Sequence, residues 1–226
     1  MSNALIDFHT HILPGLDHGS KSIEETKAQI ALFLKYNVRE VVCTSHFYGH
    51  VHRIDDFLAK REESALLLEK YIKENELDFQ YHLSAEVLAF VGMENLDRLS
   101  ELTIGNSSTL LIELPYGPLS SNVETSIVKL KKNGYDILLA HADRYDVTDI
   151  EKLITIGAKV QLNAGALCSM FIKRAYLRWI KDGVCVALGS DIHADDEKAI
   201  QKFIKATKKT EKYKQNFIDY GKMILK

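Results

Sequence analysis

The chain has 226 residues, of which 46% are hydrophobic, and its 29 Lys and Arg nearly balance its 31 Asp and Glu. This composition is enough for one sizeable core, and we expect a single domain over residues 1–226. The formal net charge of -2 excludes a general electrostatic attraction to nucleic acid or to an anionic membrane surface. The cysteines Cys43, Cys168 and Cys185 are too few and too scattered for a disulfide framework and lack CxxC zinc spacing.

The sequence also lacks the signals of membrane insertion and secretion. No apolar run approaches the length of a membrane span, and the N-terminus lacks a basic stretch followed by an apolar secretory segment. Together with the cysteine pattern, this predicts a cytoplasmic protein without membrane insertion. The sequence leaves homo-oligomerisation open.

Short apolar runs rich in Val, Ile and Leu predict seven β-strands. They lie at residues 5–8, 40–44, 79–85, 109–112, 136–140, 159–162 and 184–188. Most of these runs are continuous, which is typical of parallel strands that are covered on both faces, whereas the third alternates.

Helical patterns follow these strands. They lie at residues 22–36, 55–74, 122–132, 152–156, 171–181, 197–208 and 212–225. Ser22 and Glu25 form a capping box for the first helix, Asn37 can end it, and Asn133-Gly134 is a left-handed stop for the third. The alternation of strand and helix predicts an α/β fold with a parallel sheet, closed or nearly closed into a barrel, with the terminal helices capping the floor.

Side chains that can bind metal lie at or just after the ends of the hydrophobic runs. They are His9, His11, His18, His46, Glu86, Glu113, His141, Asp191 and His193. Parallel α/β barrels carry their chemistry at the C-terminal ends of their strands, so these side chains would converge on one cavity. Imidazoles and carboxylates that converge predict a polynuclear metal centre and a metal-dependent hydrolase.

The two ends of the chain carry similar spacings. His9 and His11 end the first strand, and residues two apart in an extended segment point the same way, so both imidazoles can reach one metal. Asp191 and His193 repeat this spacing after the last strand. The alternative for Asp191 is a helix N-cap with an incidental His193, because a helix follows soon after.

Three further residues strengthen the hydrolase interpretation. Glu86 and Glu113 each end an apolar run, where a carboxylate is costly unless it meets a cation. The alternative for each is a salt bridge with a Lys or Arg. Arg144 lies three residues after His141, and a guanidinium there could hold phosphate oxygens, although an arginine in a loop is usually solvated or salt-bridged.

One competing motif is rejected. Cys168 and Arg174 have the CxxxxxR spacing of a cysteine-nucleophile phosphatase, but the bulky residues between them cannot curl their amides around a phosphate. Cys168 is therefore expected to be a packed thiol. His50, His52 and His82 have no matching partners and are expected at the surface or at the rim of the cleft.

These motifs together resemble the polymerase-and-histidinol-phosphatase (PHP) superfamily, and within it the bacterial capsule-type protein-tyrosine phosphatases. The resemblance covers nearly the whole chain. It rests on IDFHTHILPG at 6–15, TSH at 44–46, AE at 85–86, LIE at 111–113, AHADRY at 140–145 and SDIH at 190–193. It implies a distorted (β/α)7 TIM-like barrel that holds three divalent metal ions, with manganese expected and iron or zinc as alternatives.

The resemblance also implies which residues share each metal ion, with Glu86 bridging two of them. The sets are His9, His11, Glu86 and Asp191 for the first metal, Glu86, Glu113 and His141 for the second, and His46, His193 and His18 for the third.

The chain departs from this branch at three places. His18 stands where a second aspartate is usual, which keeps a ligand but puts metal identity in doubt. Ala142-Asp143 replaces Pro-Glu before Arg144 and preserves the cation. The segment after His193 lacks the arginine and proline often found nearby, so a phosphate contact on the substrate side is expected to be missing.

The resemblance implies hydrolysis of phosphotyrosine on the tail of a bacterial tyrosine kinase that controls capsule or exopolysaccharide synthesis. We expect in-line attack by a hydroxide that bridges two metal ions, with Arg144 stabilising the equatorial oxygens. His46 or His193, where not fully occupied by metal, would help to protonate the leaving oxygen.

Three alternatives stay open at this point. The first is a phosphatase of a small phosphate ester such as histidinol phosphate, which the openness of the loop at residues 47–53 would decide. The second is a metal-dependent amidohydrolase, which Glu113 disfavours because those sites usually bridge their metals through a modified lysine. The third is a weakly active metal-binding regulatory protein that docks on a kinase, which His18 leaves open.

Overall fold

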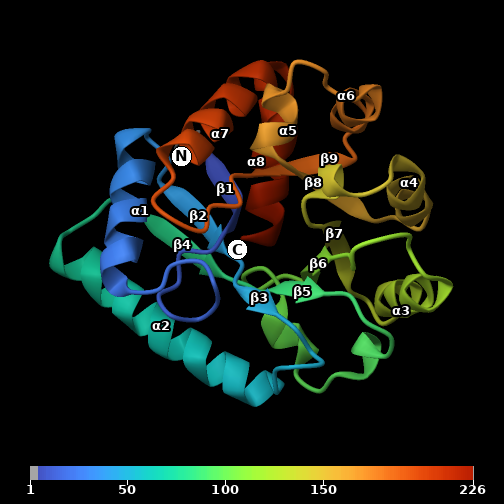
Figure 1. The fold of residues 1–226 in the computed structure, drawn as a ribbon, viewed down its shortest axis with the longest axis horizontal. Coiled ribbons are helices and arrows are strands. Elements are labelled where there is room, and N and C mark those ends of the chain that lie inside the picture. Colours follow the sequence, from blue (N-terminus) through green and yellow to red (C-terminus); the bar gives the residue numbers. More distant parts are fainter. Residues whose placement is uncertain (1–4, 226) are drawn as a thin grey trace.

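The computed structural model describes residues 5–225, which form nine strands that pair in parallel throughout (Figure 1). The strands are β1 (Ile6–Thr10), β2 (Glu40–Cys43), β3 (His46–Phe47), β4 (Gln80–Leu83), β5 (Glu86–Leu88), β6 (Thr109–Glu113), β7 (Asp136–Leu139), β8 (Lys159–Asn163) and β9 (Cys185–Gly189).

Eight α-helices lie between or after these strands within residues 5–225. They are α1 (Ile23–Lys35), α2 (Ile54–Glu74), α3 (Ser121–Lys132), α4 (Val147–Thr155), α5 (Ala164–Cys168), α6 (Arg174–Lys181), α7 (Glu197–Lys209) and α8 (Lys214–Ile224). Short 3-10 turns occur at Met93–Asn95, Leu99–Leu102, Ala142–Arg144 and Glu211–Tyr213.

The strands form two sheets, in the orders β1-β2-β4 and β3-β5-β6-β7-β8-β9. Chain segments of two residues lead from β2 into β3 and from β4 into β5, so each pair acts as one interrupted strand that crosses from the first sheet to the second. At the opposite edges, Thr10 bridges Ile192 and the amide of His11 donates to the Ile192 carbonyl at 3.0 Å. The seven predicted strands therefore correspond to the seven sides of a distorted α/β barrel.

The floor of this barrel is closed by α8. One buried cluster joins this helix to side chains from β1, β2, β6, β7 and β9. Its larger members are Phe8, Val42, Leu111, Leu138, Val186, Tyr220 and Ile224. The prediction that terminal helices cap the floor is confirmed for α8, whereas α7 packs outside the barrel against α1 and α5.

Helix α1 forms where its capping signals predicted it. The Ser22 hydroxyl accepts from the Glu25 amide at 3.3 Å, and the Glu25 carboxylate accepts from the Lys21 amide at 2.7 Å. The capping box thus reaches one residue further back than its usual partner, the N-cap amide. Asn37 ends the helix in the left-handed region with a φ of 58°, as its position predicted.

Other boundaries differ from the prediction for local reasons. Helix α4 begins five residues earlier, because the Asp146 carboxylate caps it by accepting from the Thr148 amide at 2.7 Å. Helix α6 begins at Arg174, and Phe171 lies exposed in the preceding loop. The short α5 was not predicted, since its five residues carry no side-chain cap. The last helix, predicted over 212–225, begins two residues later at Lys214, because Glu211–Tyr213 forms a 3-10 turn before it.

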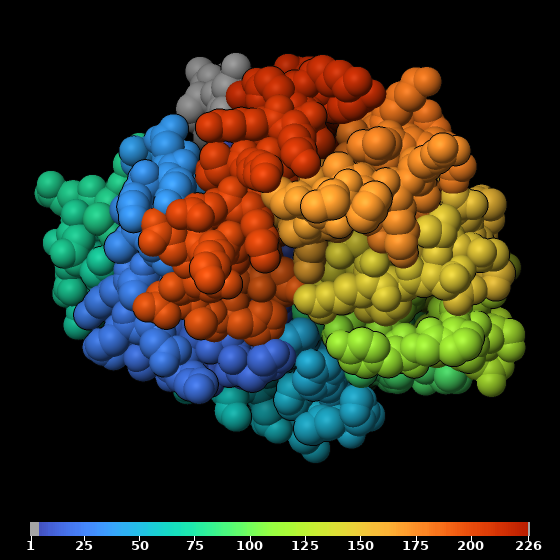
Figure 2. All heavy atoms as spheres, turned by 45° about the horizontal axis from the view of Figure 1, so that its top comes forward, coloured from blue at the N-terminus to red at the C-terminus, as the bar shows by residue number. Residues whose placement is uncertain are grey.

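The two ends of the described chain lie side by side. Figure 2 shows the orange and red C-terminal segments against the blue N-terminal ones. This contact joins β1 to β9 and α1 to α7, and it brings together two motifs that are far apart in the sequence. Within residues 5–225, none of the helices combines the length and the apolar composition needed to cross a bilayer.

Candidate metal centre

The predicted metal-binding residues meet at the carboxyl ends of the strands. Most belong to a strand end or to the loop that follows a strand, as in other parallel barrels, whereas His46 and Glu86 begin the short strands β3 and β5 that follow β2 and β4. Ligand atoms of eight of the nine residues come within 4.8 Å of one another in four groups of three. These groups are His9, His11 and Asp191; His9, Glu86 and His141; His46, Glu86 and Glu113; and His11, His46 and His193.

Glu86 lies at the middle of this arrangement and is fully buried. Its Oε2 is 2.9 Å from His46 Nδ1, 3.2 Å from His9 Nε2 and 3.4 Å from His11 Nε2. Its Oε1 is 2.6 Å from His141 Nε2. A carboxylate whose two oxygens face different imidazoles has the geometry of a bridging ligand.

The other two carboxylates lie on opposite sides of Glu86. Asp191 Oδ1 is 3.5 Å from His9 Nε2 and 3.4 Å from His11 Nε2. On the other side, Glu113 approaches His141 at 3.6 Å and His46 at 3.7 Å. The two sides of the centre therefore have separate carboxylates and share Glu86.

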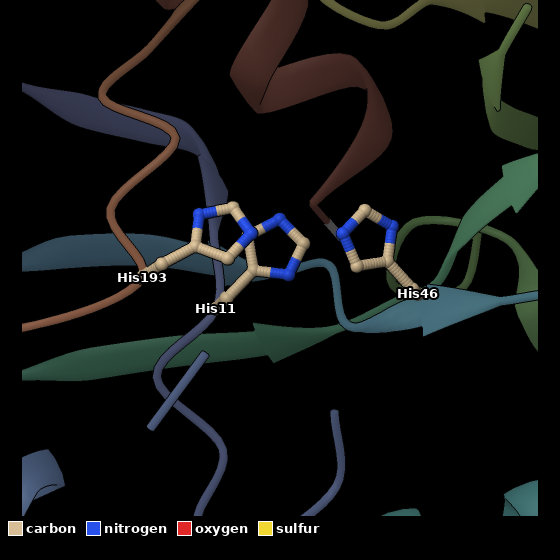
Figure 3. Close-up of side chains that lie close together, drawn as sticks. All are labelled: His11, His46 and His193. Carbon is tan, nitrogen blue, oxygen red and sulfur yellow. The ribbon is translucent and has the colours of Figure 1, made fainter. Parts of the chain in front are cut away.

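Histidines stack along the open side of the centre. Figure 3 shows the rings of His11 and His193 close together with that of His46 beside them, and the His11 and His193 ring centroids are 3.9 Å apart. His18 stacks on His46 at 4.7 Å and on His193 at 4.6 Å. His18 belongs to none of the four groups and is exposed, so it lies at the rim of the centre.

Two of the predicted ligands have unusual backbone conformations. His141 has a φ of 30° and Asp191 a φ of 56°, which are left-handed values that side chains other than glycine rarely adopt. The alternative that Asp191 caps a helix is wrong, because Asp196 caps α7 by accepting from the Lys198 amide.

The pKa values of the three carboxylates are shifted from their usual ranges. Burial opposes ionisation of Glu86, but the surrounding imidazoles, His9 first among them, hold the pKa of Glu86 well below its usual range. Asp191 shows the same balance, with burial overcome by His9 and His11, and its pKa is also lowered. Burial and the charge of Glu86 raise the pKa of Glu113. Glu113 is thus the carboxylate whose ionisation most needs a nearby cation.

The pKa values of two imidazoles, those of His193 and His11, are shifted in opposite directions. Burial, followed by the nearby charge of His11, lowers the pKa of His193 to about 4, so His193 is neutral near pH 7 with a free ring nitrogen. Burial opposes protonation of His11, but its hydrogen bond with Asp17 is the largest effect that raises its pKa well above the usual value.

The donor atoms fit divalent cations. Five buried atoms of the predicted ligands have no hydrogen-bond partner: His46 Nδ1, Glu86 Oε2, His141 Nδ1, Asp191 Oδ1 and His193 Nε2. Buried polar atoms of this kind are costly unless something else satisfies them. Six imidazoles and three carboxylates without sulfur suit manganese, iron or zinc.

Arg144 lies beside the centre and is partly accessible. Its Nη2 contacts Asp191 Oδ2, and 38% of its side chain is exposed. It lines a cleft of about 240 Å³ together with Asn163, Asp191 and Lys202. The salt-bridge alternative for Arg144 therefore holds, and its guanidinium nevertheless faces an open cleft next to the predicted ligands.

Two buried polar residues of the centre were missed by the sequence analysis. Asp17 Oδ2 is 2.8 Å from His11 Nδ1 and accepts from the His46 amide at 2.9 Å, so it orients two predicted ligands. Gln161 is fully buried on β8 and approaches His9. A glutamine in the middle of an apolar strand was a usable signal, because a buried amide needs partners.

The residues rejected as ligands lie outside the four groups. The Cys168 thiol donates to the Lys202 carbonyl at 3.4 Å, which agrees with a packed thiol. His82 is 2.9 Å from Glu40, and His52 Nδ1 accepts from the Tyr48 amide at 3.2 Å. These histidines have partners of their own.

Comparison with known proteins places this chain in a family. The model of the family "Capsular polysaccharide synthesis, CpsB/CapC" matches residues 5–225. The chain belongs to the CpsB/CapC family. The predicted resemblance to capsule-type proteins is therefore confirmed at the level of the family.

Named relatives in the CpsB/CapC family are about a quarter identical to this chain. Tyrosine-protein phosphatase CpsB of Streptococcus pneumoniae is 26% identical over 208 residues, covering 86% of this chain and 85% of the relative. Tyrosine-protein phosphatase YwqE of Bacillus subtilis is 25% identical over 200 residues, covering 84% of this chain and 77% of the relative.

Solved structures support the fold. A structure described as one of YwqE and CpsB, "unique metal-dependent tyrosine phosphatases", superposes with a TM-score of 0.81 at 20% identity, covering 98% of this chain and 94% of the other. A putative histidinol phosphatase from Listeria monocytogenes gives a TM-score of 0.54 at 12% identity, covering 91% and 99%. The CpsB/CapC chain therefore has the fold predicted from the PHP resemblance.

Proposed function

We propose that the protein is a metal-dependent phosphatase of phosphotyrosine, and that residues 1–226 act as one domain. The observation that carries this proposal is the convergence of two further carboxylates and five imidazoles around Glu86, with His18 and Arg144 at the edge. The names of the relatives support the choice of phosphotyrosine. We further propose that it acts in the cytoplasm on the tail of a tyrosine kinase of capsule synthesis.

The cation-binding residues would divide into three sets, and Glu86 would be shared by the first two. His9, His11 and Asp191 would serve one cation, and Glu113 and His141 a second. His193 would serve a third with His46 and His18, and His18 would have to turn inward to take part. Bound divalent cations would lower the pKa of a water molecule and neutralise charge on the phosphoryl group.

Arg144 would hold the phosphoryl group from the side. Its guanidinium is fixed at one nitrogen by Asp191 and retains further N–H groups that face the cleft. Because a guanidinium can donate two parallel hydrogen bonds to phosphate oxygens, it would orient the group and stabilise charge that develops on it. His193 is neutral near pH 7, so protonation of the departing phenolate would fall to water, or to His46 where no cation occupies it.

An aromatic side chain beside the centre favours an aromatic ester. The Tyr48 ring stacks on His46 with centroids 5.2 Å apart and an interplanar angle of 21°. Two backbone bonds to the Tyr48 carbonyl, from Val51 and His52 at 2.8 Å, hold its loop in place. Tyr116, which follows β6, is 91% exposed. A phosphotyrosine ring would find aromatic contacts at this rim.

Steady-state kinetics on metal-reconstituted protein test the proposal. With Mn²⁺, we expect kcat/KM to be higher for a phosphotyrosine peptide from a kinase tail than for histidinol phosphate. Iron and zinc are to be assayed in parallel. Equal or better hydrolysis of histidinol phosphate would favour a small-ester phosphatase. Tight peptide binding without turnover under any divalent metal would favour a regulatory protein.

A further inference from the structure

Strand β8 supplies none of the predicted ligands, yet its last residues contact several of them. Gln161 Oε1 accepts from the His141 amide at 2.5 Å and lies 3.2 Å from His9 Nδ1. A backbone N–H can only donate, so the oxygen of the Gln161 side chain must face it. A neutral His9 then donates through Nδ1, which leaves its Nε2 without a proton toward Glu86.

The orientation of the Gln161 side-chain amide also determines the orientation of the Asn163 side-chain amide on the same strand. With its oxygen toward His141, Gln161 donates through Nε2 to Asn163 Oδ1 at 3.0 Å. Asn163 in turn donates through Nδ2 to Asp191 Oδ2 at 2.9 Å. Asp191 Oδ1 is left without a hydrogen-bond partner and is the oxygen that approaches His9 and His11.

Local features show that these contacts are specific. Asn163 is the N-cap residue of α5, where asparagine usually bonds to the helix, but its side chain makes no such bond. A Cβ at Gly189 would lie 2.5 Å from His9 Cβ and 2.7 Å from Gln161 Nε2. Only glycine at position 189 therefore allows β1 and β8 to bring His9 and Gln161 together across β9.

Two side chains donate to Asp191 Oδ2, and they reach it from different parts of the site. Arg144 contacts it from the open cleft, whereas Asn163 reaches it from the strand. If Arg144 turns to hold a phosphoryl group, it gives up part or all of its contact with Asp191. Asn163 can then still keep Oδ1 directed at the centre.

We propose that Gln161 and Asn163 form a hydrogen-bonded relay that positions His9, His141 and Asp191, and that Asn163 holds Asp191 in place when Arg144 engages substrate. The relay selects the ligand atom of His9 and of Asp191. This inference rests on the proposed function, because it assumes that the clustered ligands form a metal centre.

The first test is the affinity for Mn²⁺, followed by the electron paramagnetic resonance signal of the free ion in phosphate-free buffer. Gln161→Leu should weaken binding about 10- to 100-fold, since such outer contacts typically matter to that extent. Gln29→Leu is the matched control, because Gln29 is also fully buried but its amide has no partner. It should bind Mn²⁺ as the wild type does.

Gln161→Glu separates positioning from packing. It keeps the shape and the oxygen that faces His9 and His141 but replaces the donor to Asn163 with a second acceptor, so we expect Mn²⁺ affinity between those of wild type and Gln161→Leu. Equal affinity in Gln161→Leu and wild type would overturn the role of Gln161. A loss in Gln161→Glu as large as in Gln161→Leu would do the same.

A double-mutant cycle tests the shared oxygen of Asp191. Asn163→Ala and Arg144→Ala should each lower Mn²⁺ affinity by less than about threefold, because one donor remains, and together by about 30-fold or more, well above the roughly ninefold product of the single losses. Additive losses would overturn the role of Asn163. A wild-type protein that binds no Mn²⁺ would instead refute the proposed function, and one that binds Mn²⁺ but hydrolyses no ester would leave the relay intact.

Discussion

The two ends of the barrel are built from the same strands and have opposite chemistry. Leu111 and Glu113 lie two residues apart on β6 and share a face, but Leu111 packs in the apolar cluster near the floor and Glu113 enters the centre. At the floor, Tyr220 and Ile224 of α8 cover the strands. Stability and chemistry are thus separated along single strands.

This separation explains how the fold carries so many buried polar groups. The floor gains free energy from apolar burial, whereas the open end has buried atoms without partners, which are costly until cations satisfy them. Changes at the open end should alter metal content and activity. Changes at the floor should alter the free energy of unfolding alone.

The largest effect is expected at Glu86. Glu86→Gln removes the charge that faces four imidazoles, so we expect loss of bound metal and a fall in phosphatase activity of more than about 1,000-fold. Metal analysis and kinetics on the purified variant measure both. Glu94→Gln is the control, since Glu94 is a buried carboxylate that pairs with Lys129 outside the centre. Equal metal content in Glu86→Gln and wild type would contradict the view that the open end of the barrel binds metal through Glu86.

Arg144 should affect turnover more than metal content. Arg144→Ala removes the cation beside the phosphoryl group, and we expect kcat/KM to fall about 100- to 1,000-fold with bound metal retained. Arg178→Ala is the control, because Arg178 is exposed and pairs with Glu151 away from the centre. Unchanged kinetics in Arg144→Ala would mean that Arg144 only supports Asp191.

At the floor of the barrel, we expect substitutions to change stability and to leave metal content and turnover unchanged. Ile224→Ala leaves a cavity under the strands and should lower the free energy of unfolding by about 2–5 kcal/mol. The metal content and kcat of the folded protein should not change. Met223→Ala on the same helix is 57% exposed and should have little effect on stability. A fall in metal content in Ile224→Ala would show that the two ends are coupled.

A helix cap outside both regions gives the smallest effect. The Ser120 hydroxyl accepts from the Val123 amide at 3.3 Å at the start of α3. Ser120→Ala should lower the free energy of unfolding by about 1 kcal/mol, as measured by urea denaturation, without a change in activity. A loss of activity here would show that α3 affects the centre.

The apolar runs of the sequence predicted the seven sides of the barrel. The residue types at the ends of those runs predicted the residues of the centre. The sequence did not predict β3 and β5, which have two and three residues and include His46 and Glu86. Strands so short carry no periodic pattern. Their existence depends on pairing with strands that are distant in the sequence.

The contacts that orient the ligands were also beyond the sequence. Gln161 approaches His9 across 152 positions, and Asp17 reaches the His46 amide across 29. The left-handed φ of His141 and of Asp191 was not indicated by their residue types either, because neither is glycine. Residue types at strand ends indicate a centre, but only the fold shows which atom of each ligand faces it.

The most direct test is the metal content of the freshly purified protein, measured by inductively coupled plasma mass spectrometry alongside Glu86→Gln. If the strand ends form one polynuclear centre, wild-type protein will hold about three divalent ions per chain and the variant far fewer. Fewer than about one ion per chain in wild type, with no uptake of Mn²⁺, Fe²⁺ or Zn²⁺ on reconstitution, would contradict the account.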